Sequence, residues 1–459
     1  MVSANTSAQI QPWHAYLRAL EITHTLVEPE SSLPATPDGY AARARLRLAR
    51  LKMLLGALGN PHHQTPLIHV AGTSGKGSTS AAIAGGLHRS GYRTGLHTSP
   101  YLQSATEKLQ IDGTLISGSD FAERIDEILQ TAAGVPEFVS QPPSYGEVWM
   151  ALALYWFSHE RVDVAVIETG AGGRFDLSNV ITPVMSVITS VGIDHTETLG
   201  STIREIAWHK AGIIKRGVPV VTAVRDQEAL DAIVHEATLT GSQVIFPPNL
   251  SASLPGGAHS KSVPPFQQSN LALAATTLRA MRDAGFETSE EAIEIGLTTL
   301  RLPGRFEIVA ESPTVLLDGA HNVQKAASLA EALGNLRPAV NGRTVLIFGS
   351  LESKHPDQML RLLTPQFDRL ILTAPVASGK VDAHPAKLAD ELAEEGYAGE
   401  ITVETDPQAA MSMALGEARP NDLIVVTGSL YLIGNIRERW FSTRAIVEQQ
   451  TPWPEAGMR

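Results

Sequence analysis

The sequence predicts an α/β protein of two domains: a larger N-terminal domain with a mainly parallel sheet and a smaller C-terminal α/β domain. The chain has 459 residues, whereas one domain usually takes about 150. Hydrophobic residues make up 43% and charged residues 18%, as in folded chains with real cores. From residue 67 onward, short apolar runs alternate with helical stretches. This alternation predicts parallel strands that helices cover on both faces.

The region before residue 60 is predicted to be helical. Leu48, Leu51, Leu55 and Leu58 share one helical face, and basic residues surround it. Such a helix either lies on a membrane or packs in the protein with a solvated basic face, and we favour packing because no second membrane signal is present. The longest apolar run, 148–157, is far shorter than the about 20 residues of a membrane span. The N-terminus has no signal-peptide pattern.

Strands and breaks define the predicted domains. The N-terminal strands are 67–71, 94–98, 162–167, 184–189, 218–223 and 243–246. Residues 247–269 are rich in Pro, Gly and Ser and predict a loop, and a helix follows over 270–284. The Leu-Pro-Gly triplet at 302–304 interrupts the pattern, so the predicted domains are 1–301 and 302–459. The C-terminal strands are 314–317, 344–348, 369–373, 401–404 and 422–426.

Composition excludes several kinds of chemistry. The chain has no cysteine, which excludes disulfides, cysteine-ligated zinc, iron–sulfur clusters and thiol nucleophiles. Its net charge of −12 argues against nucleic-acid binding, which needs a basic surface. The lack of cysteine fits a reducing compartment, and we predict a cytoplasmic protein with no membrane partner.

A glycine-rich loop between a strand and a helix is the sharpest local signal. Glycines let the backbone curl so that its N–H groups face one anion, and the helix N-terminus adds a partial positive charge. The motif is a short variant of the phosphate loop, because Val70 stands where the standard form has its first glycine. The predicted nucleotide-contacting residues are Gly72, Thr73, Gly75, Lys76, Gly77, Ser78 and Thr79.

Two polar residues follow neighbouring predicted strands. Glu168 ends the strand at 162–167, and His195 follows the strand at 184–189. If these strands are parallel neighbours, both side chains lie near the phosphate loop, where they suit magnesium. A structural carboxylate and a structural histidine are the alternatives. Lys210 reads, on periodicity alone, as a lysine near a helix C-terminus.

The second domain offers weaker signals at its start. Arg305 follows the Leu-Pro-Gly triplet, and its guanidinium suits a γ-phosphate or an interdomain ion pair. Asp318 ends the strand at 314–317 and suits a ribose or a lysine, and His321 follows it closely.

Taken together, the ordered motifs resemble the folylpolyglutamate synthase/dihydrofolate synthase family of the Mur ligase superfamily. The motifs, spread over about residues 40–437, are HVAGTSGKGST, HTSP, ETGAGGRFD, TSVGIDHTETLG, IAWHKAGIIK, LPGRFE, LDGAHN and VTGSLYLIG. The resemblance implies a P-loop ATPase-like N-terminal domain and a Rossmann-like C-terminal glutamate ligase domain. The chain departs from the family pattern at Ser74, Val323, 106–110 and 380–385.

The resemblance also implies roles for individual residues. The implied ATP contacts are Gly75, Lys76, Gly77, Ser78, Asn270, Arg305 and Asp318. The implied ligands of two magnesium ions are Ser99, Glu168, His195 and a CO2-derived carbamate on Lys210. The implied pteroate contacts are Ser144, Tyr145, Gly146, Glu147, Phe175, Asp176 and Leu177. The catalytic set is Lys76, His195, Lys210, Arg305 and His321.

The implied reaction is an amide ligation that uses ATP, L-glutamate and a folate or dihydropteroate, by way of an acyl phosphate, in a monomeric enzyme. One alternative is a Mur-type peptidoglycan ligase, against which the GIDHT segment at 192–196 argues. A second is a regulatory nucleotide switch, against which the absence of a guanine-binding Asn-Lys-x-Asp signature argues. A third is an inactive relative kept as a binding module.

Overall fold

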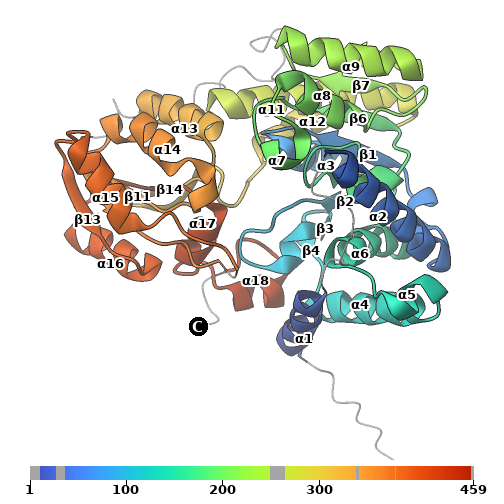
Figure 1. Cartoon of the computed structure of the whole chain (residues 1–459), viewed down its shortest axis with the longest axis horizontal. Helices are drawn as coiled ribbons and strands as arrows, with labels where there is room; N and C mark the ends of the chain where they lie inside the picture. Colours follow the sequence, from blue (N-terminus) through green and yellow to red (C-terminus); the bar gives the residue numbers. More distant parts are fainter. Residues whose placement is uncertain (1–10, 27–36, 249–263, 337–340, 378, 456–459) are drawn as a thin grey trace, which may run out of the picture. The chain divides into compact units, whose positions relative to one another are not determined.

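A computed structural model of the chain describes residues 11–26, 37–248, 264–336, 341–377 and 379–455 (Figure 1). These residues form two compact units. Unit 1 holds the described residues up to 248 together with 268–300 and 444–454, and unit 2 holds 264–267, 301–443 and 455. The segment 444–454 therefore packs with unit 1, where the Leu115 N–H donates to the Gln450 carbonyl (2.9 Å).

The predicted α/β class with mainly parallel sheets is confirmed. In unit 1, eight strands form one sheet in the order β4-β3-β2-β5-β1-β6-β7-β8. The strands are β1 Leu67–Ala71, β2 Thr94–His97, β3 Leu109–Ile111, β4 Thr114–Leu115, β5 Val164–Glu168, β6 Met185–Ile188, β7 Val220–Thr222 and β8 Val244–Ile245. The strands from β2 to β8 in this order are parallel, and β3 and β4 add antiparallel pairs at one edge.

Helices cover both faces of this sheet. They are α1 Pro12–Thr25, α2 Pro37–Ala57, α3 Lys76–Arg89, α4 Gly118–Ala133, α5 Pro136–Ser140, α6 Tyr145–His159, α7 Thr196–Leu199, α8 Ile203–Ala211, α9 Gln227–Thr240, α11 Pro265–Ala280, α12 Glu290–Thr298 and α18 Thr443–Gln449, with the 3₁₀ turns η1 Pro61–His63, η2 Ala105–Lys108, η3 Leu177–Val180 and η5 Met281–Ala284. Ala165 and Ile167 of β5 pack into the core that α1, α2, α4 and α6 close. Successive side chains alternate between faces, so Val166 and Glu168 face the α3 side.

The β3–β4 hairpin was not among the predicted strands. Its turn is Asp112-Gly113, with φ of 54° and 80°. Positive φ at both central residues is the turn that matches the twist of a hairpin, and Asp-Gly is its usual sequence. The signal was therefore present, but the flanking strands are only two and three residues long.

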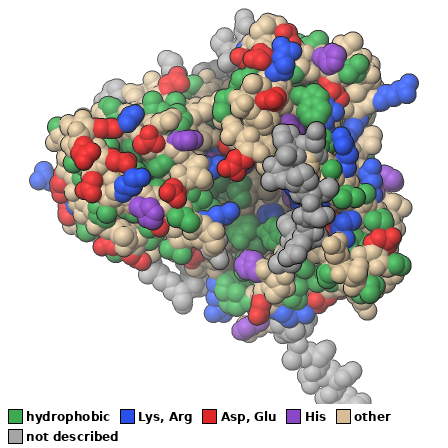
Figure 2. All heavy atoms as spheres, viewed as in Figure 1, with side chains coloured by type: hydrophobic (Ala, Val, Ile, Leu, Met, Phe, Trp, Pro, Cys, Tyr) green, Lys and Arg blue, Asp and Glu red, His purple; other side chains and the backbone are tan. Residues whose placement is uncertain are grey.

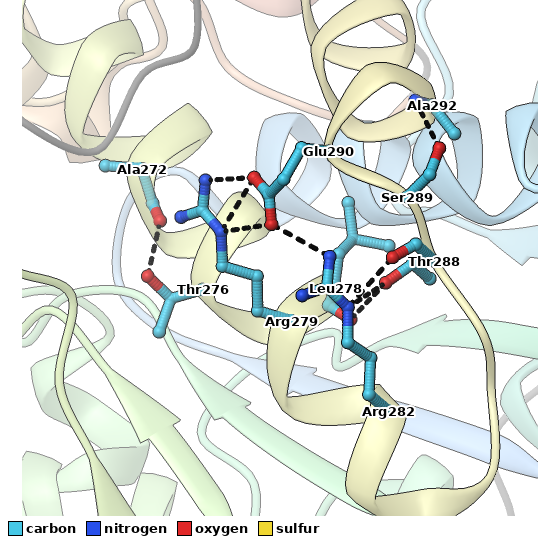
Figure 3. A network of polar contacts seen from close by, with 9 residues as sticks. All are labelled: Ala272, Thr276, Leu278, Arg279, Arg282, Thr288, Ser289, Glu290 and Ala292. Atoms are coloured by element: carbon cyan, nitrogen blue, oxygen red, sulfur yellow. Dashed lines mark hydrogen bonds and ion pairs between the residues drawn. The ribbon is translucent and has the colours of Figure 1, made fainter.

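Helix α11 begins at Pro265, five residues earlier than predicted, so the predicted loop ends there; its residues 249–263 lie outside the described part. Figure 3 shows how this helix is joined to α12: Arg279 and Arg282 both donate to Glu290 (2.7 and 2.8 Å). Gly296 of α12 packs so closely on α3 that a Cβ there would lie 2.7 Å from the Gly86 Cα. The α11–α12 pair thus supports the helix that follows the phosphate loop.

Unit 2 has a six-stranded sheet in the order β13-β12-β11-β14-β10-β9. The strands are β9 Glu307–Glu311, β10 Thr314–Leu317, β11 Thr344–Phe348, β12 Arg369–Leu372, β13 Glu400–Val403 and β14 Leu423–Thr427. The helices are α13 Val323–Leu336, α14 Pro356–Leu363, α15 Pro385–Glu394, α16 Pro407–Glu417 and α17 Leu430–Arg437. Two 3₁₀ turns are η7 Glu352–Lys354 and η8 Thr364–Gln366. All pairs are parallel except β9–β10. The edge strand β9 was not predicted, since it follows the Leu-Pro-Gly break directly.

The surface drawn in Figure 2 mixes acidic and basic side chains rather than separating them into fields. Among the described residues, none of the helices has the length and apolar character needed to cross a bilayer. The apolar run of α6 is instead core: Val148 and Leu152 are fully buried, and Phe157 packs under Gly95 of β2.

Candidate functional site

The phosphate loop joins the end of β1 to the start of α3, and residues after β6 hold its shape. The Thr73 N–H donates to the Ser190 carbonyl (2.9 Å), and the Ser74 N–H donates to Ser190 Oγ (2.9 Å). Thr189 Oγ1 donates to the Ser74 carbonyl (2.6 Å). Sequence analysis assigned no role to Thr189 or Ser190, although both follow a strand that neighbours β1. Contacts from the segment after β6 therefore hold the shape of the loop.

Two glycines of the loop are required by close approach. A Cβ on Gly72 would lie 1.8 Å from Thr189 Oγ1, and one on Gly75 would lie 2.1 Å from Asn270 Oδ1. Gly75 also has φ of 81°, which side-chain-bearing residues rarely adopt. Asn270 of α11 thus lies against the loop, and its contact with ATP remains a prediction. Lys76 Nζ donates to the Gly72 carbonyl (3.1 Å), so its ammonium lies over the loop.

Glu168 and Ser99 lie together beside the loop. Glu168 Oε2 accepts the Ser99 N–H (3.1 Å), and it would lie 3.4 Å from a Cβ on Gly77, at the first turn of α3. The Glu168 side chain is buried, and Thr79 Oγ1 is buried with no hydrogen-bond partner among the described residues. A carboxylate and hydroxyls next to a phosphate-binding helix are the oxygen donors that Mg²⁺ takes alongside phosphates and water. The residues present therefore fit a magnesium ion.

His195 lies in a different setting from Glu168. It is exposed, has φ of 51°, and precedes the short helix α7. Within the described ranges, no three or more His, Asp or Glu side chains are grouped as a ready-made metal cage. Magnesium needs few protein ligands when a nucleotide supplies phosphates, so the assignment of His195 remains a prediction.

Lys210 is buried in the last turn of α8, with 2% of its surface exposed. The glycines after β5 pack on this turn, because a Cβ on Gly173 would lie 2.8 Å from the His209 carbonyl and 2.9 Å from that of Lys210. Burial, with Arg174 and Lys210 nearby, lowers the pKa of His209 to about 4. The carbamate on Lys210 remains a prediction.

The predicted pteroate contacts at 175–177 flank an aromatic cluster. Phe175 packs against His209 (ring centroids 5.5 Å), Trp208 (6.0 Å) and Tyr40 (6.3 Å). Asp176 instead accepts the backbone N–H groups of residues 170, 171 and 178 (3.1, 3.2 and 2.9 Å), which shapes the glycine turn. Leu177 packs on the core. Tyr40 was not in the predicted set. Its contact with Phe175 joins residues far apart in the sequence and is seen only in the structure.

The predicted contacts at 144–147 start helix α6. Ser144 and Glu147 form a capping box, in which the Ser144 N–H donates to Glu147 Oε2 (2.8 Å). Glu147 also pairs with Arg50 (2.9 Å), and both Ser144 and Glu147 are fully buried. The contacts of Ser144 and Glu147 are therefore structural, whereas Tyr145 and Gly146 are partly exposed. Their contact with a substrate remains a prediction.

Unit 2 brings Arg305, Asp318 and His321 together. Asp318 accepts the N–H groups of Phe306 and Ala320 (both 2.9 Å), and Arg305 Nη1 would lie 2.6 Å from a Cβ on Gly319. Burial raises the pKa of Asp318, and the Arg305 charge opposes that shift. The loop carrying Arg305 is anchored by Glu307, which accepts from Arg437 Nε (2.9 Å) at the end of α17.

His321 is a neutral imidazole by its hydrogen bonds. Nδ1 donates to the Gly319 carbonyl (2.8 Å), and Nε2 accepts from Lys325 Nζ (2.9 Å). Burial, with Lys325 and Arg305 nearby, lowers the pKa of His321 well below its usual value. Lys325 was missed by sequence analysis. The available signal was its position four residues after His321, because the first turn of α13, which begins at Val323, brings Lys325 back toward His321.

Comparison with known proteins gives a consistent set of relatives. Residues 304–430 match the model of the Mur ligase, glutamate ligase domain. The dihydrofolate synthase/folylpolyglutamate synthase of Bacillus subtilis is 34% identical over 416 residues, covering 85% of this chain and 94% of the relative. The crystal structure of folylpolyglutamate synthase from Thermotoga maritima matches with a TM-score of 0.74 and 30% identity, covering 93% and 96% of the two chains. Escherichia coli FolC, solved with DHPP and ADP, matches with a TM-score of 0.76 and 26% identity, covering 94% and 99%.

Proposed function

Because the chain belongs to the folylpolyglutamate synthase/dihydrofolate synthase family, we propose that it is an ATP-dependent ligase that joins L-glutamate to a pteroyl carboxylate. The observation that carries the proposal is the hydrogen-bonded phosphate loop with buried Glu168 beside it. The match of 304–430 to a glutamate ligase domain supports glutamate as the second substrate. The B. subtilis relative is named for both folate activities, which supports dihydropteroate and folates as acceptors.

In the proposed reaction, a carboxylate oxygen of the acceptor attacks the γ-phosphorus of ATP, and ADP leaves. The product is an acyl phosphate. The amine of L-glutamate then attacks the acyl carbon, loses a proton, and inorganic phosphate leaves. No side chain forms a bond to substrate, so the protein acts by positioning and by stabilising charge.

The residues divide this work by their positions. The backbone of the loop and the N-terminus of α3 hold phosphate oxygens, and Lys76 neutralises charge on the terminal phosphates. Arg305 and Asp318 are proposed to contact ATP, and the Phe306 N–H holds the Asp318 carboxylate in place. His321, neutral and fixed by Lys325, is proposed to orient a reacting group rather than to carry charge.

Ser99, Glu168 and His195 are proposed to hold magnesium, and a carbamate on Lys210 a second ion. Bound magnesium would neutralise charge developing on the transferred phosphoryl group. Lys210, which is buried in the last turn of α8, is the lysine proposed to carry this carbamate. We further propose a monomer that acts in the cytoplasm.

The test is glutamate-dependent ADP formation from Mg-ATP, with dihydropteroate and tetrahydrofolate as separate acceptors. Turnover with both supports a bifunctional enzyme, and turnover with tetrahydrofolate alone limits the proposal to a polyglutamate synthase. ATP binding without turnover on either acceptor would overturn the ligase assignment in favour of a nucleotide-dependent regulator or an inactive module. A UDP-linked peptide acceptor, tested in parallel, addresses the Mur-type alternative.

A further inference from the structure

Lys108 is a buried cation on the hairpin edge of the unit 1 sheet. It ends η2 next to β3, and 7% of its surface is exposed. Its Nζ lies 3.8 Å from the centroid of the Trp149 ring and 5.2 Å from that of Tyr145, both on α6. In the described part of the chain, no carboxylate lies within ion-pair distance of this ammonium. Aromatic faces attract a cation but do not neutralise it.

The acids on the same elements are engaged elsewhere. Glu107 accepts the N–H groups of residues 102, 103 and 104 (2.9, 3.1 and 3.0 Å), which shapes the loop before η2. Glu147 pairs with Arg50 (2.9 Å) and caps α6. Neither carboxylate is directed at Lys108, so an anion from outside the chain would be its natural partner.

Two further nitrogens near Lys108 are buried without a hydrogen-bond partner. Neither His97 Nδ1 nor Trp149 Nε1 has a hydrogen-bond partner within the described residues. Burial, with the Lys108 charge as a second cause, lowers the pKa of His97 to about 3, so the imidazole is neutral. The ring donates its one N–H to the Glu168 backbone, which leaves Nδ1 as an acceptor, whereas Trp149 Nε1 is always a donor. Buried donors without acceptors are rare in native proteins and indicate a missing partner.

This group lies next to the proposed magnesium site. The Lys108 carbonyl accepts the Thr98 N–H (3.0 Å), and the following residue, Ser99, donates to Glu168 (3.1 Å). A second phosphate-binding group is not needed here, since the loop at 72–79 already supplies one. A cation bordered by the flat rings of Tyr145 and Trp149 instead suits an aromatic acid.

We propose that Lys108 binds the carboxylate of the pteroyl acceptor, with the rings of Tyr145 and Trp149 beside the aryl group that carries it. The inference rests on the proposed function, which supplies the class of acceptor. It assigns Lys108 a role in choosing and positioning that substrate. It also gives the partly exposed Tyr145 a task that the buried Ser144 and Glu147 do not have.

The test uses calorimetry, with Mg-ADP present, to compare the binding of pteroate with that of its uncharged carboxamide. It is done at about pH 6, below the pKa of the Lys108 ammonium, so that this group is charged. The wild type should prefer the acid by about 10- to 100-fold, the range of a charged hydrogen bond. Lys108→Met should lose this preference while keeping its affinity for the carboxamide, since methionine packs well on aromatic rings. Lys108→Arg should retain the preference, and Lys387→Met, at a lysine whose side chain is 69% exposed, should match the wild type.

An unchanged acid-to-amide ratio in Lys108→Met, with an unchanged melting temperature, would overturn the inference. So would a wild-type protein that binds the acid no better than the amide. The measurement needs neither glutamate nor turnover, so the ligation assay can fail while this comparison still gives its answer.

Discussion

The phosphate loop of unit 1 and the Arg305–His321 region of unit 2 are built in opposite ways. The loop is fixed by neutral contacts, namely backbone groups and the hydroxyls of Thr189 and Ser190. Its charged member Lys76 donates to the Gly72 carbonyl and, among the described residues, to no carboxylate. The unit 2 region is fixed by charges: Glu307 with Arg437, and Asp318 beside Arg305. Neutral supports can be lost one at a time at moderate cost, whereas a buried charge that loses its partner is strongly destabilising.

The largest expected effect follows from breaking the charged support. Arg437 is fully buried and makes three contacts with Glu307 (2.9–3.1 Å). Arg437→Met removes the guanidinium that faces the Glu307 carboxylate, so the free energy of unfolding should fall by about 3–5 kcal/mol. Chemical denaturation measures it. The double variant Arg437→Met/Glu307→Met should recover a large part of the loss, and a double variant no better than the single one would show that packing, not charge, supports this loop.

The next effect concerns catalysis rather than folding. Lys76→Met removes the charge over the phosphate loop and should lower kcat/KM for ADP formation by about 10²- to 10³-fold, the usual cost of losing one group that stabilises developing charge. Its melting temperature should stay near that of the wild type, because the side chain bonds only to the Gly72 carbonyl. Lys387→Met, at an exposed position on α15, is the matched control. Activity of Lys76→Met within threefold of the control would remove Lys76 from the mechanism.

The two regions also differ in how much of them the sequence could predict. The loop signal is local, since strand, glycines, lysine and helix follow one another in the chain. Its support by Ser190 is not predictable, because the pairing of β1 with β6 depends on strand order. The same holds for Tyr40 beside Phe175 and for Lys108 over Trp149, which come from elements far apart in the sequence. Short edge elements such as β4 escape prediction because two residues carry no periodicity.

A smaller effect should follow from removing one neutral support of the loop. Ser190 Oγ accepts the Ser74 N–H (2.9 Å) and donates to the Ser74 carbonyl (3.0 Å). Ser190→Ala should lower the free energy of unfolding by about 1–2 kcal/mol and weaken ATP binding, since a buried N–H is left without its acceptor. Nucleotide titration of the wild type and the variant checks this. An unchanged ATP affinity would mean that the loop is shaped by its glycines alone.

The smallest effect is expected at Glu290 of α12, the helix that packs on α3. Arg279 and Arg282 both donate to its carboxylate (Figure 3). The hydrogen bond from Arg279, with that from Arg282, lowers the pKa of Glu290 from its ordinary 4.5 to about 2. A depressed carboxyl pKa stabilises the fold above pH 4.5, and this contribution fades as the pH falls toward 2. Because the Glu290 side chain is 54% exposed, solvent screening limits the gain, and Glu290→Gln should cost about 0.5–1 kcal/mol at pH 7.

Denaturation of the wild type and Glu290→Gln at pH 7, 4.5 and 3 measures that difference, which should shrink with falling pH. Asp126→Asn is the matched control, because Asp126 pairs with Arg18 at a similarly exposed position (47% for both side chains) but lacks a second arginine. If the stability difference between the wild type and Glu290→Gln stays constant with pH, the variant is destabilised by poorer packing of the amide and not by the loss of the carboxylate charge. The support of α3 would then be neutral throughout, like the loop it follows, in contrast to the charged Glu307–Arg437 support in unit 2.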